Sequence, residues 1–227
     1  MSTLKSRLDV VEQKISEAAS NSGRSRDDIT LVVVSKNNPA QLVLDLAEIG
    51  VSNFGENRDQ EAKPKAAEVA LAGKTVTWHF VGQLQSNKAK SALSYSSVLH
   101  SLDRPSLLDA VGKAVADRAE PLDVFIQLNL TDDQNRGGIQ TQNVLGFAEQ
   151  VLQTPNLRLL GLMGVAGLDV DPRVDFDRIR NSSEQLMRLA PDAKYISAGM
   201  SEDFELAIAS GATHVRIGTA ITGKRPY

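Results

Sequence analysis

The sequence predicts an α/β protein folded as a single (β/α)8 (TIM) barrel, a closed ring of eight parallel strands covered by helices. Eight short apolar runs alternate with segments of helical periodicity, which is the pattern of a parallel sheet. A length of 227 residues suits one barrel. The first turn, SKNNPA, has no glycine-rich fingerprint, which disfavours an open doubly wound sheet. We therefore expect residues 1–227 to form one domain.

The eight expected strands are spread along the whole chain. They are LVVVSK from residue 31, VSNFGEN from 51, TWHFVG from 77, SVLHSL from 97, DVFIQLNL from 123, LRLLGLMG from 157, KYISAG from 194 and THVRIG from 213. Helical segments follow the first seven, but only TAITGKRPY follows the eighth. Leu4, Leu8, Val11 and Ile15 have helical spacing, so an additional N-terminal helix is expected to fill the vacant place.

Composition restricts the classes of partner. The formal charge of −3 gives no general attraction for nucleic acid or anionic membranes. The absence of cysteine excludes disulfides, thiol nucleophiles and Cys-ligated zinc, and is compatible with a reducing compartment. No stretch has the ~18 apolar residues of a membrane span or the apolar core of a signal peptide. We expect a cytoplasmic protein with neither nucleic acid nor membrane as partner.

Lys36 ends the first expected strand and has two interpretations. Its stem could lie along the apolar wall with the ammonium group in solvent. Alternatively, it is a partly desolvated amine that is nucleophilic toward aldehydes. Chemistry in these barrels sits at the C-terminal ends of the strands, where the sequence places this lysine. The position favours the second interpretation.

Two loops are suited to a phosphate group. SAGMSED follows the seventh strand, where Gly199 permits a tight turn and Ser201 adds a hydroxyl group. RIGTAITG follows the eighth strand, where Gly218 lets an anion approach the backbone and Thr219 donates another bond. The loops after strands seven and eight are the recurrent phosphate site of such barrels. The alternative for Ser201 is an ordinary helix N-cap.

Arg216 is a charged residue inside the eighth strand. Alternation places it on the same face as His214 and Gly218, where it either lines the barrel mouth or pairs with a carboxylate. An arginine keeps its proton in a protein, so against a pyridine nitrogen it would donate and leave that nitrogen unprotonated. Together with Lys36 and the two phosphate loops, it predicts a phosphorylated aldehyde held as a Schiff base. Pyridoxal 5′-phosphate (PLP) is the obvious candidate.

The loop TDDQNRGGI contains Asp132 and Asp133 but lacks the alternating ligands of a calcium loop, so no metal site is expected. Its Arg136 is a candidate contact for an anion at the barrel mouth. His79 lies inside the third strand. It is either a neutral histidine bonded within the barrel or part of the cofactor site.

Five motifs, in this order, resemble those of one family: VVSKNNP, FGENRDQE, WHFVGQLQSNK, GLMGVA and SAGMSEDFELAIASGATHVRIGTAITG. They cover nearly the whole chain. The family is that of the pyridoxal phosphate homeostasis proteins, also called the YggS or proline synthetase co-transcribed homologue family. It is similar to the barrel domain of fold-type III alanine racemase without the second β-domain.

The resemblance implies a set of cofactor-binding residues and no catalytic ones: Lys36, Asn57, His79, Ser197, Met200, Ser201, Arg216, Gly218 and Thr219. Lys36 would form the Schiff base and Arg216 would face the pyridine nitrogen. The phosphate would be held by Ser201, Gly218, Thr219 and the backbone of Met200. Asn57 would lie near the ring, with His79 and Ser197 at the pocket floor or wall.

The chain departs from the family pattern at the edge of the pocket. Asn37 stands where the family usually has Thr, and Arg58 and Asp59 stand where it has Tyr-Val. The resemblance therefore leaves the role of Arg58 open.

Three functions compete. The resemblance favours a protein of intracellular PLP (vitamin B6) homeostasis that binds PLP without substrate turnover. The alternatives are a PLP-dependent enzyme of the amino-acid racemase type and a phosphosugar enzyme that uses Lys36. A racemase needs two proton carriers, and none of Tyr95, Tyr195 and Tyr227 ends an expected strand at the catalytic face. Expected partners are PLP, other B6 vitamers and, transiently, PLP-dependent enzymes. We expect a monomer, because the second domain that builds the racemase dimer is absent.

Overall fold

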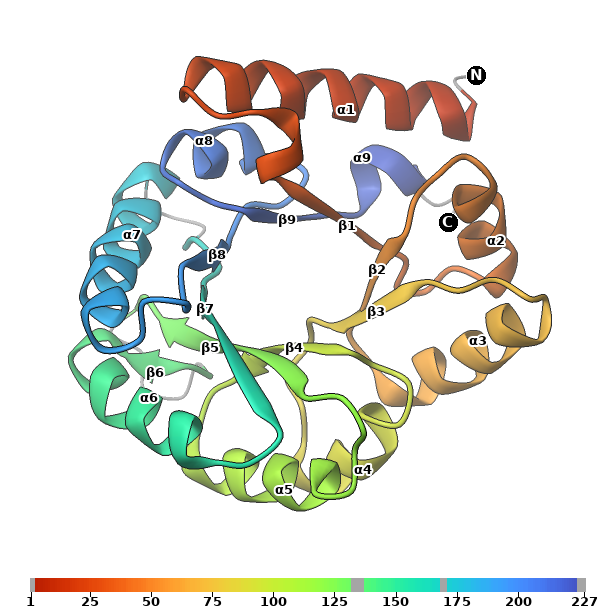
Figure 1. Cartoon of the computed structure of the whole chain (residues 1–227). Coiled ribbons are helices and arrows are strands. Elements are labelled where there is room, and N and C mark those ends of the chain that lie inside the picture. The colour runs from red at the N-terminus through yellow and green to blue at the C-terminus, as the bar shows by residue number, and fades with distance from the viewer. Residues whose placement is uncertain (1–2, 132–136, 168–170, 224–227) are drawn as a thin grey trace.

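The computed structural model describes residues 3–131, 137–167 and 171–223. Eight parallel strands close into a barrel (Figure 1): β1 Thr30–Val34, β2 Asn53–Glu56, β3 Thr77–Phe80, β4 Val98–Leu102, β5 Leu122–Asn129, β7 Leu157–Met163, β8 Tyr195–Ser197 and β9 His214–Ile217. The ring is closed because β1 pairs with both β2 and β9, and β5 pairs with both β4 and β7. The predicted (β/α)8 barrel is confirmed.

Helices form the outer layer of the barrel (Figure 1). In the described part of the chain they are α1 Leu4–Asn21, α2 Ala40–Glu48, α3 Asp59–Leu71, α4 Ala89–Ala92, α5 Pro105–Val115, α6 Val144–Gln153, α7 Pro172–Leu189, α8 Phe204–Ala209 and α9 Thr219–Thr222. Short 3-10 turns cover Arg26–Asp28, Ser86–Lys88 and Thr141–Asn143. Among the described residues, no helix combines the length and apolar character needed to cross a bilayer.

The N-terminal helix occupies the place that the sequence analysis assigned to it. Figure 1 shows α1 lying along α8 and the short α9. Val11 and Ile15 on its inner face are buried in the same cluster as Ile221 of α9. The Nε of Arg7 donates to the carbonyl oxygen of Ile221 at 2.6 Å. Helix α1 therefore covers the strand β9 that has only one turn of helix after it.

Side chains fill both sides of the barrel wall. Outside the ring, Phe54 and Trp78 pack under the helices, with their ring centroids 5.9 Å apart. A small apolar cluster contains Val98, Phe125 and Met163. The ring of Phe125 stacks on the buried imidazole of His100, with centroids 4.7 Å apart. Polar side chains therefore lie among apolar ones in the core.

The two-residue strand β6, Ile139–Gln140, was not predicted. It pairs with Leu128 and Asn129 at the end of β5. The segment GGIQTQN has no apolar run, so periodicity gives no sign of a strand. Gly138 has φ +129°, and a Cβ there would lie 2.4 Å from the backbone nitrogen of Asn129. This close approach of the two segments requires glycine.

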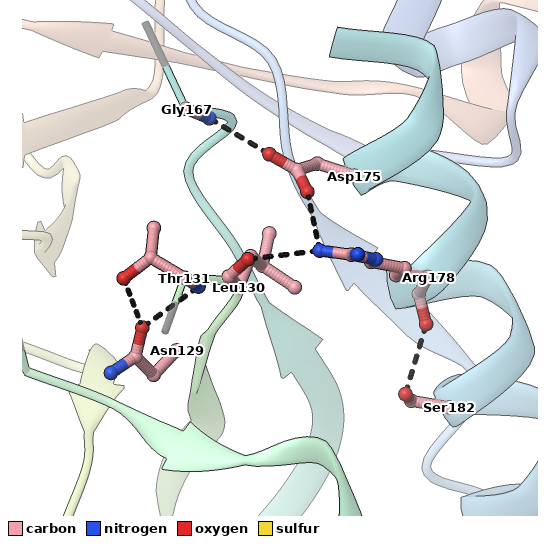
Figure 2. A network of polar contacts seen from close by, with 7 residues as sticks. All are labelled: Asn129, Leu130, Thr131, Gly167, Asp175, Arg178 and Ser182. Atoms are coloured by element: carbon pink, nitrogen blue, oxygen red, sulfur yellow. Dashed lines mark hydrogen bonds and ion pairs between the residues drawn. The ribbon is translucent and has the colours of Figure 1, made fainter. Parts of the chain in front are cut away.

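A buried carboxylate anchors the segments that follow β5 and β7 (Figure 2). Asp175 of α7 is 2% exposed, and its Oδ2 accepts from the backbone N–H of Gly167 at 2.8 Å. Its Oδ1 lies 3.4 Å from Nη1 of Arg178, which donates to the carbonyl oxygen of Leu130 at 3.1 Å. Helix α7 therefore holds both segments in place at the C-terminal end of the barrel.

Candidate functional site

Lys36 lies at the C-terminal end of β1, as predicted, but its side chain is exposed rather than partly desolvated. Strand β1 ends at Val34 and Ser35 is buried, so Lys36 stands on a turn beyond the strand. The next residue, Asn37, has φ +62°, and its N–H donates to Oε2 of Glu61 at 2.9 Å. Asparagine tolerates this left-handed conformation better than a β-branched residue such as threonine does.

A buried ion pair lies directly beneath this turn. The Nζ of Lys65 is 2.5 Å from Oε1 of Glu56, with side chains 5% and 1% exposed. The same ammonium group donates to the carbonyl oxygen of Ser35 at 2.9 Å, and the Ser35 hydroxyl donates to Oε1 of Glu56 at 2.7 Å. The pair therefore fixes the residue before Lys36. Sequence reasoning missed Lys65, although it shares a helical stripe with the buried Ala62, Ala66 and Val69.

Hydrogen-bond donors from the two predicted phosphate loops converge on one oxygen. The Oγ of Ser201 lies 3.3 Å from each of three donors, the backbone nitrogens of Gly218 and Ala220 and Oγ1 of Thr219. A Cβ at Gly218 would come no closer than 3.4 Å to the nearest atom, the carbonyl oxygen of Val34. Internal packing therefore does not demand glycine at 218. A ligand that approaches the backbone gives a reason for it.

Met200 is placed differently from the other expected phosphate ligands. Its backbone N–H donates to Oδ1 of Asp203 at 2.6 Å, and 41% of the residue is exposed. A phosphate contact from this N–H requires Asp203 to give up that bond. The preceding Gly199 has φ +92°, and a Cβ there would lie 2.7 Å from Cβ of Ala207. The tight turn predicted at Gly199 is present, and the role of Met200 stays a prediction.

Asn57, after β2, has a buried Oδ1 without a hydrogen-bond partner in the part of the chain that the structure describes. Its backbone lies so close to Gly82 that a Cβ on that glycine would be 2.2 Å from the carbonyl oxygen of Asn57. An unsatisfied buried oxygen costs about 1–3 kcal/mol. A ligand donor near Asn57 would remove that cost.

Arg216 points into the barrel and is 5% exposed. Its Nη1 donates to Oγ of Ser197 at 2.5 Å and its Nη2 to the carbonyl oxygen of Gly164 at 2.9 Å. Neither of these two bonds goes to a carboxylate. The described contacts of Arg216 therefore do not support the alternative that it pairs with a carboxylate. Burial lowers the pKa of Arg216 to about 10, with Asp203 acting in the opposite direction. The guanidinium therefore remains charged at neutral pH.

His79 and Ser197 lie in the buried interior rather than at the mouth. His79 is 3% exposed, and its two ring nitrogens contact Nε2 of His100 at 2.9 Å and Oδ1 of Asn53 at 3.0 Å. Ser197 is fully buried, and its Oγ lies 2.8 Å from Nδ1 of His100. Sequence reasoning missed His100, although it stands inside the fourth expected strand as His79 stands inside the third.

The remaining candidates add little to the site. Arg58 is the exposed residue directly before α3, and its Nη1 lies 3.9 Å from Oε1 of Glu61. Asp132, Asp133 and Arg136 lie outside the described residues. Within residues 3–131, 137–167 and 171–223, no three His, Asp or Glu side chains are grouped as metal ligands would be.

Comparisons with known proteins agree with this architecture. The family model described as alanine racemase, N-terminal domain, matches residues 7–226. The pyridoxal phosphate homeostasis protein of Mycobacterium leprae is 38% identical over an alignment of 232 residues, gaps included. The alignment covers 95% of this chain and 90% of that protein. The protein of the same name from Escherichia coli K12 is 37% identical over an alignment of 231 residues, which covers 100% of this chain and 99% of that protein.

A solved structure is also similar. PipY of Synechococcus elongatus PCC7942, with PLP bound, has a TM-score of 0.81 and 32% identity, covering 92% of this chain and all of that one. The (β/α)8 barrel and the family-model match thus place the protein in the class of the alanine racemase N-terminal domain. Within that class, the chain belongs to the family of pyridoxal phosphate homeostasis proteins.

Proposed function

We propose that this protein binds PLP as a Schiff base on Lys36 and serves PLP homeostasis in the cytoplasm without turning over a substrate. The observation that carries the proposal is the grouping of three chemical features at one end of the barrel. These are the exposed amine of Lys36, the donors converging on Ser201, and the buried cation of Arg216. Membership of the family of pyridoxal phosphate homeostasis proteins and the similarity to PLP-bound PipY support it.

Each feature matches one part of PLP. The amine of Lys36 adds to the aldehyde carbon, and water leaves as the C=N bond forms. Because Lys36 is exposed, its reactivity depends on a phosphate held nearby, which raises the effective concentration of the aldehyde. Ser201, Gly218 and Thr219 hold that phosphate, with the backbone of Met200 once Asp203 releases it. Asn57 lies near the ring.

Arg216 argues for binding rather than turnover. Bound PLP supplies an electron-accepting pyridine ring, which acts most strongly when its nitrogen is protonated. Arg216 would donate a hydrogen bond to that nitrogen without transferring its proton, so the ring would stay a weak acceptor. His79 and Ser197 support this arrangement from inside the barrel.

An amino-acid racemase is the second candidate, and it needs another proton carrier at the mouth. Of the tyrosines that the structure describes, Tyr195 begins β8, which places it at the opposite end from Lys36. The hydroxyl of Tyr95 is buried, and burial raises its pKa above the usual value near 10. Neither is placed to exchange protons with a ligand on Lys36, which favours the binding function.

We further propose that the protein acts as a monomer that contacts other B6 vitamers and, transiently, PLP-dependent enzymes.

A test of the whole proposal starts with the purified protein and PLP. The wild type should develop visible absorbance that borohydride abolishes, and Lys36→Ala should develop none. Lys63→Ala, on the exposed side of α3, should behave like the wild type. A deletion strain should show altered B6 pools. No chromophore in the wild type would contradict PLP binding and favour a phosphosugar enzyme, whereas unchanged pools would contradict the homeostasis role.

A further inference from the structure

A line of polar side chains crosses the barrel interior beneath the proposed cofactor site. It begins at Asn53, the first residue of β2, and continues through His79 of β3 and His100 of β4 to Ser197 of β8 and Arg216 of β9. The four successive contacts measure 3.0, 2.9, 2.8 and 2.5 Å. Asn53 lies at the N-terminal end of the barrel, whereas Arg216 is next to the last residue of β9. The line therefore connects the two ends of the barrel.

With the Asn53 amide oriented so that its Nδ2 donates to Oγ of Ser52 at 3.1 Å, the two ends set the direction of every hydrogen bond in the line. Arg216 can only donate, so Oγ of Ser197 accepts from it, and the serine hydrogen is free to go to Nδ1 of His100. The Nε2–H of His100 then donates to Nδ1 of His79.

The other end agrees with this direction. The Nε2–H of His79 must donate to Oδ1 of Asn53, a carbonyl oxygen that can only accept. The opposite direction would place two acceptors against each other at that contact. Both imidazoles are therefore neutral, with the proton on Nε2.

Burial favours the same protonation state. His100 is fully buried, and burial, with His79 and Arg216 nearby, lowers its pKa well below the usual value near 6.5. Burial, with His214 nearby, lowers the pKa of His79 to about 3. Neither ring competes with Arg216 as a second cation at neutral pH. Arg216 is thus the charged member of this line of side chains, held at Nη1 by Ser197 and at Nη2 by the carbonyl oxygen of Gly164.

We propose that His100 and His79 are positioning residues, whose directed chain of hydrogen bonds through Ser197 aims the guanidinium of Arg216 at the pyridine nitrogen of PLP. This rests on the proposed function and adds to it the residues that determine selectivity for a ring with an unprotonated nitrogen. Losing His100 leaves the Ser197 hydroxyl free to turn, so the acceptor that fixes Arg216 is no longer oriented. The effect should be confined to ligands that use the ring nitrogen.

The test compares PLP with its 1-deaza analogue, in which C–H replaces the ring nitrogen. We expect the wild type to bind PLP on the order of tenfold more tightly than the analogue, the typical effect of a hydrogen bond to a charged group. His100→Leu should lose most of that preference while its affinity for the analogue stays within about twofold. The matched control is His214→Asn, because His214 is also buried and its Nδ1 contacts Oγ1 of Thr213 at 2.9 Å. Its ring meets that of His100 only edge-on, with centroids 6.3 Å apart, and among the described residues no hydrogen bond joins the two rings. It should keep the wild-type preference.

The outcomes separate this inference from the function on which it rests. Equal weakening of both ligands in His100→Leu, or no change in the preference, would overturn the positioning role while PLP binding stands. A wild type that binds neither ligand would overturn both. If His100→Leu does not fold, 15N spectra of histidine-labelled wild type decide instead. Two neutral imidazoles protonated at Nε2 are expected for the chain, and a protonated or Nδ1–H ring at either position would contradict it.

Discussion

The ammonium group of Lys65 lies 2.5 Å from the carboxylate of Glu56 and 2.9 Å from the carbonyl oxygen of Ser35, the residue before Lys36. A buried pair of this kind is costly to break, because either partner alone is left as an uncompensated charge. Its position directly under the proposed Schiff-base lysine links the stability of the fold to the geometry of the site.

We expect Glu56→Gln to lower the free energy of unfolding by roughly 3–5 kcal/mol, since it leaves Lys65 buried without a counter-charge. Urea unfolding at neutral pH measures this change. Glu48→Gln is the matched control, because Glu48 forms its pair with Lys74 at the surface, where it is 66% exposed. It should cost less than about 1 kcal/mol. Similar losses in both variants would show that burial of the Lys65 pair has no special role.

Ser201→Ala tests the phosphate site. The substitution removes a hydrogen-bonding group worth about 1.5–3 kcal/mol to a charged partner, so PLP should bind on the order of tenfold more weakly. Unphosphorylated pyridoxal should bind almost as before. Titration of the visible absorbance measures both ligands, with Ser94→Ala, an exposed serine bonded to the carbonyl oxygen of Ser91, as control. Equal weakening for both aldehydes would rule out a phosphate role for Ser201.

Acid should destabilise the fold through its buried histidines. Burial, together with nearby groups, lowers the pKa of His79 to about 3 and that of His214 to about 4, whereas both titrate near 6.5 when unfolded. Between these values the unfolded chain binds protons that the folded chain does not. The contribution of these histidines to the free energy of unfolding is therefore fully present above pH 6.5 and is lost as the pH decreases below it.

The slope for each such histidine should rise toward about 1.4 kcal/mol per pH unit as the pH falls below 6.5, where the unfolded histidine becomes fully protonated. Urea unfolding between pH 7 and pH 5 measures it, before most carboxylates titrate. His214→Asn should reduce the slope of unfolding free energy against pH by the contribution of one histidine. A slope that does not change in this variant would show that His214 titrates normally in the folded state.

The protein should be a poor catalyst of proton exchange at Cα. Arg216 keeps its proton, and neither described tyrosine lies beside Lys36. Incubation with PLP, L-alanine and other amino acids in heavy water should therefore give no racemisation and negligible deuterium at Cα, as measured by mass spectrometry. Many-turnover incorporation that disappears in Lys36→Ala would make the protein an enzyme.

The barrel and the positions of the two predicted phosphate loops follow from local sequence patterns. Alternation of apolar runs predicted the eight strands, and the loops around Ser201 and Gly218 were predicted because glycine and hydroxyl residues follow strands seven and eight. The contacts of Lys65 and His100 were not predicted, because they join different elements and depend on register across the sheet. The exposure of Lys36 was missed for a similar reason. Strand β1 ends at Val34, two residues before the end of the expected strand LVVVSK, and Asn37 beyond it has a positive φ.

The central claim is that Lys36 holds the cofactor, and peptide mapping tests it most directly. The protein is loaded with PLP, reduced with borohydride, digested and analysed by mass spectrometry. We predict that the pyridoxyl phosphate mass is found on Lys36 at close to one per chain. Modification of Lys65, the buried amine next to the Ser35 carbonyl, or of Lys88 or Lys90, with Lys36 unmodified, would contradict the account.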